Sequence, residues 1–401
     1  YKNIKKFLIF FALVLVLQSS LSIYLYASDN ATNSTGYTVA YNNDGKLQIV
    51  QDAYLPVGSY LDLNLSAAED LFIMDNAMYI ADTGNKRILR IRLDNGKTDV
   101  LGEGFLRTPT GVAADKEGRI YVADSGNNEA YRFNTNLELE QVFTKPDTPN
   151  FGIHANYKPL KVAPSKDGGV YLINEGSVAG LVHMDRYGGF LGYFGASEVS
   201  VNPFYAMADK ILTEEQKSLF LSRTPPSFAT IIKGPDDLIY SVNRGNAARP
   251  VKHNIGGDNI LQISQMPRVQ NAMDIDVSDD GRILVLDSDG YITEITPDGY
   301  LINIFAGPSN TERAGLFTLP TGIATDHRGY IYVLDKEKNN IQIFAPTQSQ
   351  SMLHKAISDY RQGNYEESIT LLTEVLRVNN SSRLAHTYMG KNYVQYRDYE
   401  A

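Results

Sequence analysis

The residue types that most often carry chemistry are sparse in this chain. It has no cysteine among 401 residues, which excludes disulfides, thiolate zinc sites and cysteine nucleophiles. None of its six histidines is paired at the spacing that zinc ligands need, so we expect exposed or singly hydrogen-bonded imidazoles. The histidines are His154, His183, His253, His327, His354 and His386.

Four aspartates recur at one position of a repeated string: Asp82, Asp124, Asp287 and Asp335. Catalysis rarely needs the same residue in most copies of a repeat. A carboxylate at the end of a strand can instead accept backbone N–H groups of the following turn. The recurrence therefore predicts an architectural role for these carboxylates.

Two short segments are candidates for binding. Aromatic rings pack on sugar C–H groups, and Phe204 and Tyr205 lie outside the repeated strings, so they are candidates for a carbohydrate or small-ligand surface. Arg244 and Arg249 lie in a basic stretch, residues 244–259, that would suit an anion or a partner. The alternative for that stretch is a solvated hairpin, which we favour.

The elements that would position these residues belong to a repeat. Six copies of a β-rich string start 42 to 50 residues apart, except that the third and fourth are 69 apart. A period of roughly 40–50 residues with short strands is the signature of propeller blades. The copies are residues 78–82, 120–124, 170–174, 239–243, 283–287 and 331–335.

Each copy follows a strand of small residues and a tight turn, as in Pro109-Thr110-Gly111 and Pro320-Thr321-Gly322. Small side chains suit inner strands, where blades converge on an axis. The turns contain Asp or Ser followed by Gly, which supplies a positive φ. Third and fourth strands follow in most copies, such as 139–143 and 301–305.

With these strings, the chain resembles the NHL-repeat family over about residues 60–347. The resemblance implies an all-β six-bladed β-propeller whose Pro-Thr-Gly strands line an axial channel, followed here by a short α-helical tetratricopeptide-like segment. Propellers of this kind mostly bind ligands or partners, although several enzyme families share the blade.

The chain also resembles the gluconolactonase-like propellers, which hold a divalent metal at the starts of inner strands. That resemblance implies Glu69 as one ligand, and Asp274 is the other well-placed carboxylate. The remaining ligand positions read Thr110 and Thr321, and threonine is a poor ligand for calcium. A calcium-dependent lactone hydrolase is therefore the competing hypothesis, and no cofactor is the favoured one.

The N-terminal residues resemble a targeting segment. Three lysines precede an apolar run, residues 7–17, and small residues follow, which predicts a signal peptide or membrane anchor over residues 1–27. Residues 28–36 read as a linker and 37–347 as the propeller. A helical insertion over 202–226 would cap a channel mouth or pack on a blade. We also expect strand 37–41 or 47–51 to complete blade six, because that blade reaches Pro346 without an outer strand.

Residues 348–401 show helical spacing. The segment Gln362–Ser368 resembles the turn of a tetratricopeptide repeat, which implies a protein partner, and a second copy stops at Ala401. About three repeats are usually needed for a stable array. We therefore expect either that the protein continues beyond Ala401 or that the helices pack on the propeller.

Together these features predict an exported, extracytoplasmic binding or scaffold protein, secreted or membrane-tethered. A carbohydrate or cell-wall sensor is a further alternative. The net charge of −9 argues against nucleic acid as a partner. Membrane contact would come through the N-terminal segment or through sequence after Ala401. Without cysteine, a lipid-modified N-terminal cysteine, as in a lipoprotein, is excluded.

Overall fold

The computed structural model describes residues 37–152, 155–177, 179–195, 227–245, 247–261, 266–311 and 313–396, and the backbone of 23–24. Apart from the backbone of 23–24, the predicted signal or anchor lies outside these residues, and so does the 202–226 insertion with Phe204 and Tyr205. Within the part of the chain that is described, no helix has the length and apolar character needed to cross a membrane.

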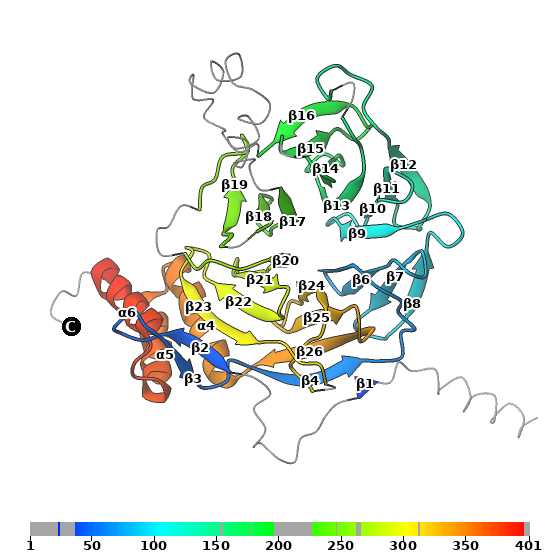
Figure 1. Ribbon diagram of the computed structural model, residues 1–401. Helices are drawn as coiled ribbons and strands as arrows, with labels where there is room; N and C mark the ends of the chain where they lie inside the picture. The colour runs from blue at the N-terminus through cyan, green and yellow to red at the C-terminus, as the bar shows by residue number, and fades with distance from the viewer. Residues whose placement is uncertain are drawn as a thin grey trace, which may run out of the picture.

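Six sheets are arranged around an axis as the blades of a β-propeller, which confirms the predicted fold (Figure 1). Blade one is β5 (Asp70–Met74), β6 (Ala77–Asp82), β7 (Arg87–Arg92) and β8 (Thr98–Leu101). Blade two is β9 (Pro109–Ala114), β10 (Ile120–Asp124), β11 (Glu129–Phe133) and β12 (Leu139–Phe143). Blade three is β13 (Pro159–Pro164), β14 (Val170–Asn174), β15 (Leu181–Met184) and β16 (Phe190–Phe194).

None of the other three blades has four strands: blade four has three, blade five has six and blade six has five. Blade four is β17 (Phe228–Lys233), β18 (Ile239–Asn243) and β19 (Pro250–His253). Blade five is β20 (Ala272–Val277), β21 (Ile283–Asp287), β22 (Tyr291–Ile295) and β23 (Leu301–Ala306), extended by β2 (Thr38–Tyr41) and β3 (Leu47–Val50). Blade six is β24 (Pro320–Thr325), β25 (Ile331–Asp335) and β26 (Asn340–Pro346), extended by β4 (Tyr54–Tyr60) and β1 (Ile23–Tyr24).

The repeated strings form the second strand of each blade. All five residues of β10 are buried, because neighbouring blades cover both faces of the strand. The inner strands carry small residues because the blades converge on the axis, as predicted. A methyl group at Gly111 would lie 2.8 Å from the carbonyl oxygen of Leu160 in the next blade. The following turn places Gly118 at φ +80°, a conformation that glycine adopts without strain.

The N-terminal strands close the ring, but not in the predicted way. β4 pairs with β26 along its length, so residues 54–60 complete blade six. The prediction that strand 37–41 or 47–51 would do so is wrong, because β2 pairs with β23 of blade five and β3 pairs with β2. The first and last parts of the propeller are still joined in one sheet, which covers the free edge of β26.

Three helices follow the last blade: α4 (Gln348–Gln362), α5 (Tyr365–Val378) and α6 (Arg383–Tyr396). They lie beside blade five in Figure 1. Their apolar faces share one cluster with Ile302 of β23, and Tyr300 packs against that cluster. Of the two expectations for this segment, packing on the propeller is the one observed.

A buried polar network fastens α4 to the propeller. Glu294 of β22 is fully buried and accepts hydrogen bonds from Tyr54 Oη at 2.7 Å and from Gln350 Nε2 at 2.8 Å. Arg282 forms an ion pair with Glu294, and His354 Nε2 lies 3.0 Å from it. The network therefore joins blade five, the closing strand and the first helix.

Candidate functional site

Three charged side chains meet at the propeller axis. The ammonium group of Lys161, on β13, forms an ion pair with Asp70 of β5 and also contacts the carbonyl oxygen of Glu69 at 3.3 Å. Asp274 of β20 accepts a hydrogen bond from Thr230 Oγ1 at 2.7 Å. Each of these side chains comes from the start of an inner strand in a different blade. We call Asp70, Lys161 and Asp274 the axial cluster.

The register of the inner strands explains the cluster. Asp70 accepts from Val112 N at 2.7 Å, and Asp274 accepts from Ile323 N at 2.9 Å, so each carboxylate ties its blade to another. The matching positions of blades two and six are glycines. A methyl group at Gly322 of blade six would lie 2.8 Å from Leu71 of blade one, so blades six and one approach closely at this point. Lys161 reaches Asp70 past the glycine of blade two.

Burial dominates the electrostatics of the axial cluster. It raises the pKa of Asp70 to about 7, with Lys161 opposing the shift and Asp274 adding to it. Burial likewise raises the pKa of Asp274, against the attraction of Lys161. Burial works against the charge of Lys161, but Asp70 and Asp274 raise its pKa above the ordinary value. Lys161 is therefore an ammonium ion at neutral pH and compensates a buried negative charge.

The residues of the predicted calcium site do not fit that ion. Glu69 forms an ion pair with Lys336, and Asp274 is engaged with Thr230. Thr321 Oγ1 donates to the carbonyl oxygen of Ala68 at 2.9 Å. Within the described residues, no three His, Cys, Asp or Glu side chains are grouped to hold a metal. Calcium needs six to eight oxygen ligands, whereas here lysines already occupy the carboxylates.

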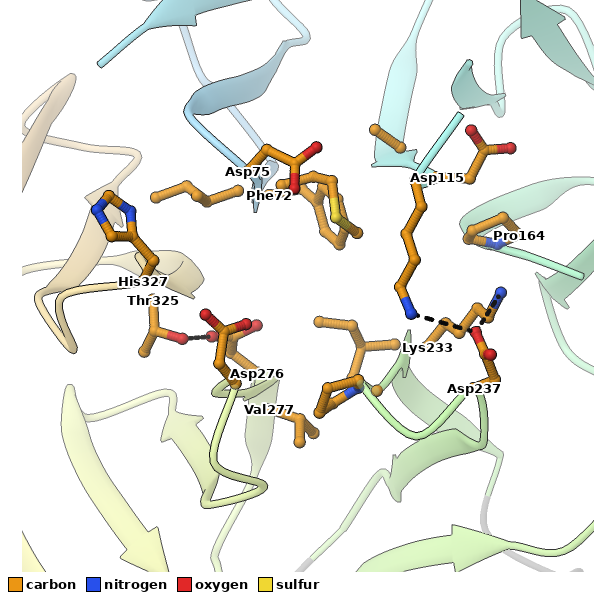
Figure 2. A pocket seen from close by; sticks show the side chains of 18 of the residues that line it. Phe72, Asp75, Asp115, Pro164, Lys233, Asp237, Asp276, Val277, Thr325 and His327 are labelled. Carbon is orange, nitrogen blue, oxygen red and sulfur yellow. Dashed lines mark hydrogen bonds and ion pairs between the residues drawn. The ribbon is translucent and has the colours of Figure 1, made fainter. Parts of the chain in front are cut away.

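A cavity of about 440 Å³ opens at the other end of the channel, where the inner strands end (Figure 2). We call it the mouth cavity. All six blades contribute to its lining, which includes Phe72, Ala114, Pro164, Ile232, Val277 and Thr325. The lining combines an apolar floor with ionisable groups from the turns after the inner strands. A space of about 20 Å³, room for about one water molecule, lies between the mouth cavity and the axial cluster.

Asp276 is a buried ionisable group of this lining, and its carboxylate lies beside Thr325 in Figure 2. It accepts a hydrogen bond from Thr325 Oγ1 at 2.6 Å. Burial raises the pKa of Asp276 to about 6, although the Thr325 hydroxyl opposes the shift. The carboxylate is thus ionised at neutral pH, and part of its hydrogen-bonding capacity faces the cavity.

The recurring aspartates have the predicted architectural role. Asp124 accepts backbone N–H groups from Arg107 and Thr108, each at 2.8 Å. Asp82 accepts from Ser66 N at 2.8 Å. Asp82 and Asp124 therefore anchor the loops that lead into their blades, whereas Asp287 accepts from Asp289 N and Tyr291 N in the turn that follows its strand.

The basic stretch includes β19, which pairs antiparallel with β18, so part of it is a strand of blade four. Arg244 follows β18 and is exposed, whereas Arg249 directly precedes β19 and is partly buried. Neither lines the mouth cavity. Glu69 and Asp274 both lie at the strand-start end of the channel, and neither lines the mouth cavity either.

Sequence reasoning missed Lys161, Asp276 and the network around Glu294. His354, expected to be exposed or singly hydrogen-bonded, contacts Gln350 at 2.6 Å, Arg282 at 3.2 Å and Glu294. A signal for the first two was present, because Lys161 and Asp276 interrupt the small-residue pattern of the inner strands. A charged residue at such a position must find a partner at the axis or face a mouth of the channel.

Comparison with known proteins supports the fold. The model of the NHL repeat matches residues 106–129. A protein of unknown function from Bacteroides thetaiotaomicron is 14% identical, with 75% of this chain and 80% of that one covered, at a TM-score of 0.50. A gluconolactonase from Xanthomonas campestris is 11% identical over 72% of this chain and 90% of its own, at 0.49.

A virginiamycin B lyase from Staphylococcus aureus is 15% identical over 77% of this chain and 87% of its own, at a TM-score of 0.45. No curated protein sequence matches the chain. At these identities the likeness concerns the fold alone. The chain is a six-bladed β-propeller that carries an NHL repeat and three C-terminal helices.

Proposed function

We propose that this chain is a non-catalytic binding protein that works outside the cytoplasm. Its propeller holds a ligand in the mouth cavity, and its helices present a surface to a protein partner. The observation that supports this most is the division of the channel: an ion-paired axial cluster at one end and a chemically mixed cavity at the other. Such a concave, partly apolar cavity with a few polar groups is the usual form of a small-molecule site.

The fixed position of the helices supports the scaffold part of the proposal. Glu294, Arg282 and His354 lock α4 against blade five, so a partner on the helices is held at a constant distance from a ligand in the cavity. The extracytoplasmic location rests on the apolar segment 7–27, which follows three lysines.

Calcium-dependent lactone hydrolysis is the competing function, and one experiment separates the two. The unfolding temperature of the purified chain is measured in EDTA and during a calcium titration, and aldonolactone turnover is assayed in parallel. We expect a change below about 2 °C and no turnover, because Lys161 and Lys336 occupy the carboxylates.

A calcium-dependent rise above about 5 °C, together with turnover that is lost in Glu69→Gln, would overturn the proposal. The matched variant Glu175→Gln changes a carboxylate paired with Lys158 in blade three. It should leave both readouts unchanged under either hypothesis.

A further inference from the structure

The mouth cavity has one cationic side. Lys233 of blade four lies beside the carboxylate of Asp237 in Figure 2, and Lys116 of blade two forms an ion pair with the same carboxylate. Lys233 Nζ lies 3.0 Å from Asp237 Oδ1, and Lys116 Nζ lies 3.8 Å from the same oxygen. Lys233 lowers the pKa of Asp237, and Lys116 and Lys166 add to this effect. Asp237 therefore balances only one of the two ammonium groups that it contacts.

The opposite side of the cavity is anionic. Asp75 of blade one and Asp276 and Asp279 of blade five line it, beside Thr325 and His327 of blade six. Among the residues that line the described cavity, the lysines are Lys116 and Lys233, which come from blades two and four. Asp115 also lines the side of blades two to four, but Arg119 balances its charge in an ion pair at 2.7 Å, so that half-ring keeps one ammonium group in excess. The half-ring of blades five, six and one is anionic.

An apolar floor lies between the two charged sides. Phe72, Ile232, Val277 and Pro164 are buried side chains from four different blades that line the cavity. Burying an apolar ligand group here would contribute roughly 25 cal/mol per Å² of area removed from water. A ligand that uses the whole cavity therefore needs an anionic end, a cationic end and an apolar part.

We propose that the mouth cavity binds a zwitterion with an apolar side chain, an amino acid or a dipeptide. This inference rests on the proposed binding function and names its ligand class. The ligand carboxylate faces Lys233 and Lys116, and its ammonium group faces Asp276 and Asp75. A purely anionic ligand would be repelled by three carboxylates, and a purely cationic one by the lysine side. A neutral sugar would leave both charged sides without a charged partner.

The test starts from a defined mixture of probes. The full chain is mixed with the twenty free L-amino acids and with dipeptides ending in leucine, each at about 1 mM, where even weak ligands are captured. Bound compounds are retained by ultrafiltration and identified by mass spectrometry. The best retained compound is then compared by calorimetry with its N-acetyl and C-amide derivatives.

We expect each derivative to bind at least about tenfold more weakly than the parent, because each loses one charge-assisted hydrogen bond. Lys233→Met should weaken binding of the parent compound by a similar factor but leave the affinity for the C-amide derivative unchanged. Asp276→Asn should weaken binding of the parent compound by a similar factor and leave the affinity for the N-acetyl derivative unchanged. Lys158→Met, which removes a lysine paired with Glu175 away from the cavity, should change nothing.

The outcomes separate this inference from the proposed function. Retention of no zwitterion, or binding that is indifferent to Lys233→Met and Asp276→Asn, overturns the zwitterion. If a glycan array run in parallel shows sugar binding instead, the zwitterion inference fails while the binding function stands. If the chain retains no probe and hydrolyses an aldonolactone, both fail.

Discussion

At the residue scale, the axial cluster decides what the propeller axis can do. Lys161 contributes a permanent positive charge between two inner-strand carboxylates, in the part of the channel where a metal would require free ligands. This feature was not predictable from spacing. Lys161 and Asp70 are 91 residues apart in the sequence, and they come from blades that are not adjacent. Only the closed ring brings them together.

Replacing Lys161 should be costly. In Lys161→Met, Asp70 and Asp274 stay buried without their cation, and breaking a buried ion pair typically costs about 3–5 kcal/mol of unfolding free energy. We expect a loss of that order at pH 7 in urea unfolding. The loss should shrink at acidic pH, where both carboxyl groups are protonated. Lys158→Met, at a more exposed pair, should stay within about 0.5 kcal/mol, and an equal loss in both variants would contradict this account.

Asp276 should make stability depend on pH. Its folded-state pKa, about 6, lies above the ordinary 3.8, so the folded protein binds this proton more tightly than the unfolded chain. Its favourable contribution is present at low pH and is lost as the pH rises from about 4 to about 6, by at most about 3 kcal/mol.

The variant Asp276→Asn cannot ionise and should escape that loss. Its unfolding free energy relative to the natural chain, measured in urea at pH 4, 5, 6 and 7, should therefore rise by about 2–3 kcal/mol across the series. A difference that is constant from pH 4 to pH 7 would show that folding does not raise the pKa of Asp276.

At the element scale, the blades were predictable and their closure was not. Each blade is made of hairpins between neighbouring strands, so its sequence signals are local: a Gly turn, a β-branched string and a terminal Asp. Closure depends on pairing between β4 and β26, which lie at opposite ends of the propeller sequence. Residues 38–41, 47–50 and 54–60 all have strand character, and local pattern does not choose among them.

The observed closure predicts a gradient of amide hydrogen exchange among the N-terminal strands. Amides of β4 that bond to β26 should exchange only with an opening free energy close to that of global unfolding. Amides of β3 should exchange through local fraying, because β3 pairs only with β2 among the described strands and Ile49 is 66% exposed. Slower exchange in residues 47–50 than in residues 54–60 would contradict this arrangement.

At the scale of the whole molecule, the helices and the propeller form one unit. The resemblance to a tetratricopeptide repeat predicted helices after residue 347, but it gave no sign of the surface that they cover. The polar contacts that hold them come from Glu294, within β22, and from Arg282, directly before β21, and neither residue stands out in the sequence. Burial alone would raise the pKa of Glu294, but His354 and Arg282 hold it at about 2.

Removing Glu294 should uncouple the helices from the propeller. In Glu294→Leu, Arg282 loses a buried partner, and we expect a loss of about 3–5 kcal/mol together with faster amide exchange in α4. The control Glu374→Leu removes an exposed pair with Arg377 and should cost less than about 0.5 kcal/mol. Unchanged exchange in α4 would mean that the apolar cluster alone holds the helices.

The central claim is that a lysine, rather than a metal ion, supplies the positive charge at the propeller axis of a binding protein. The most direct measurement is the calcium content of the purified full chain after equilibration with excess calcium and gel filtration, by inductively coupled plasma mass spectrometry. The account predicts far less than one calcium ion per chain, with Lys161→Met as the variant in which Asp70 and Asp274 are freed to bind it. One calcium ion retained per natural chain would contradict it.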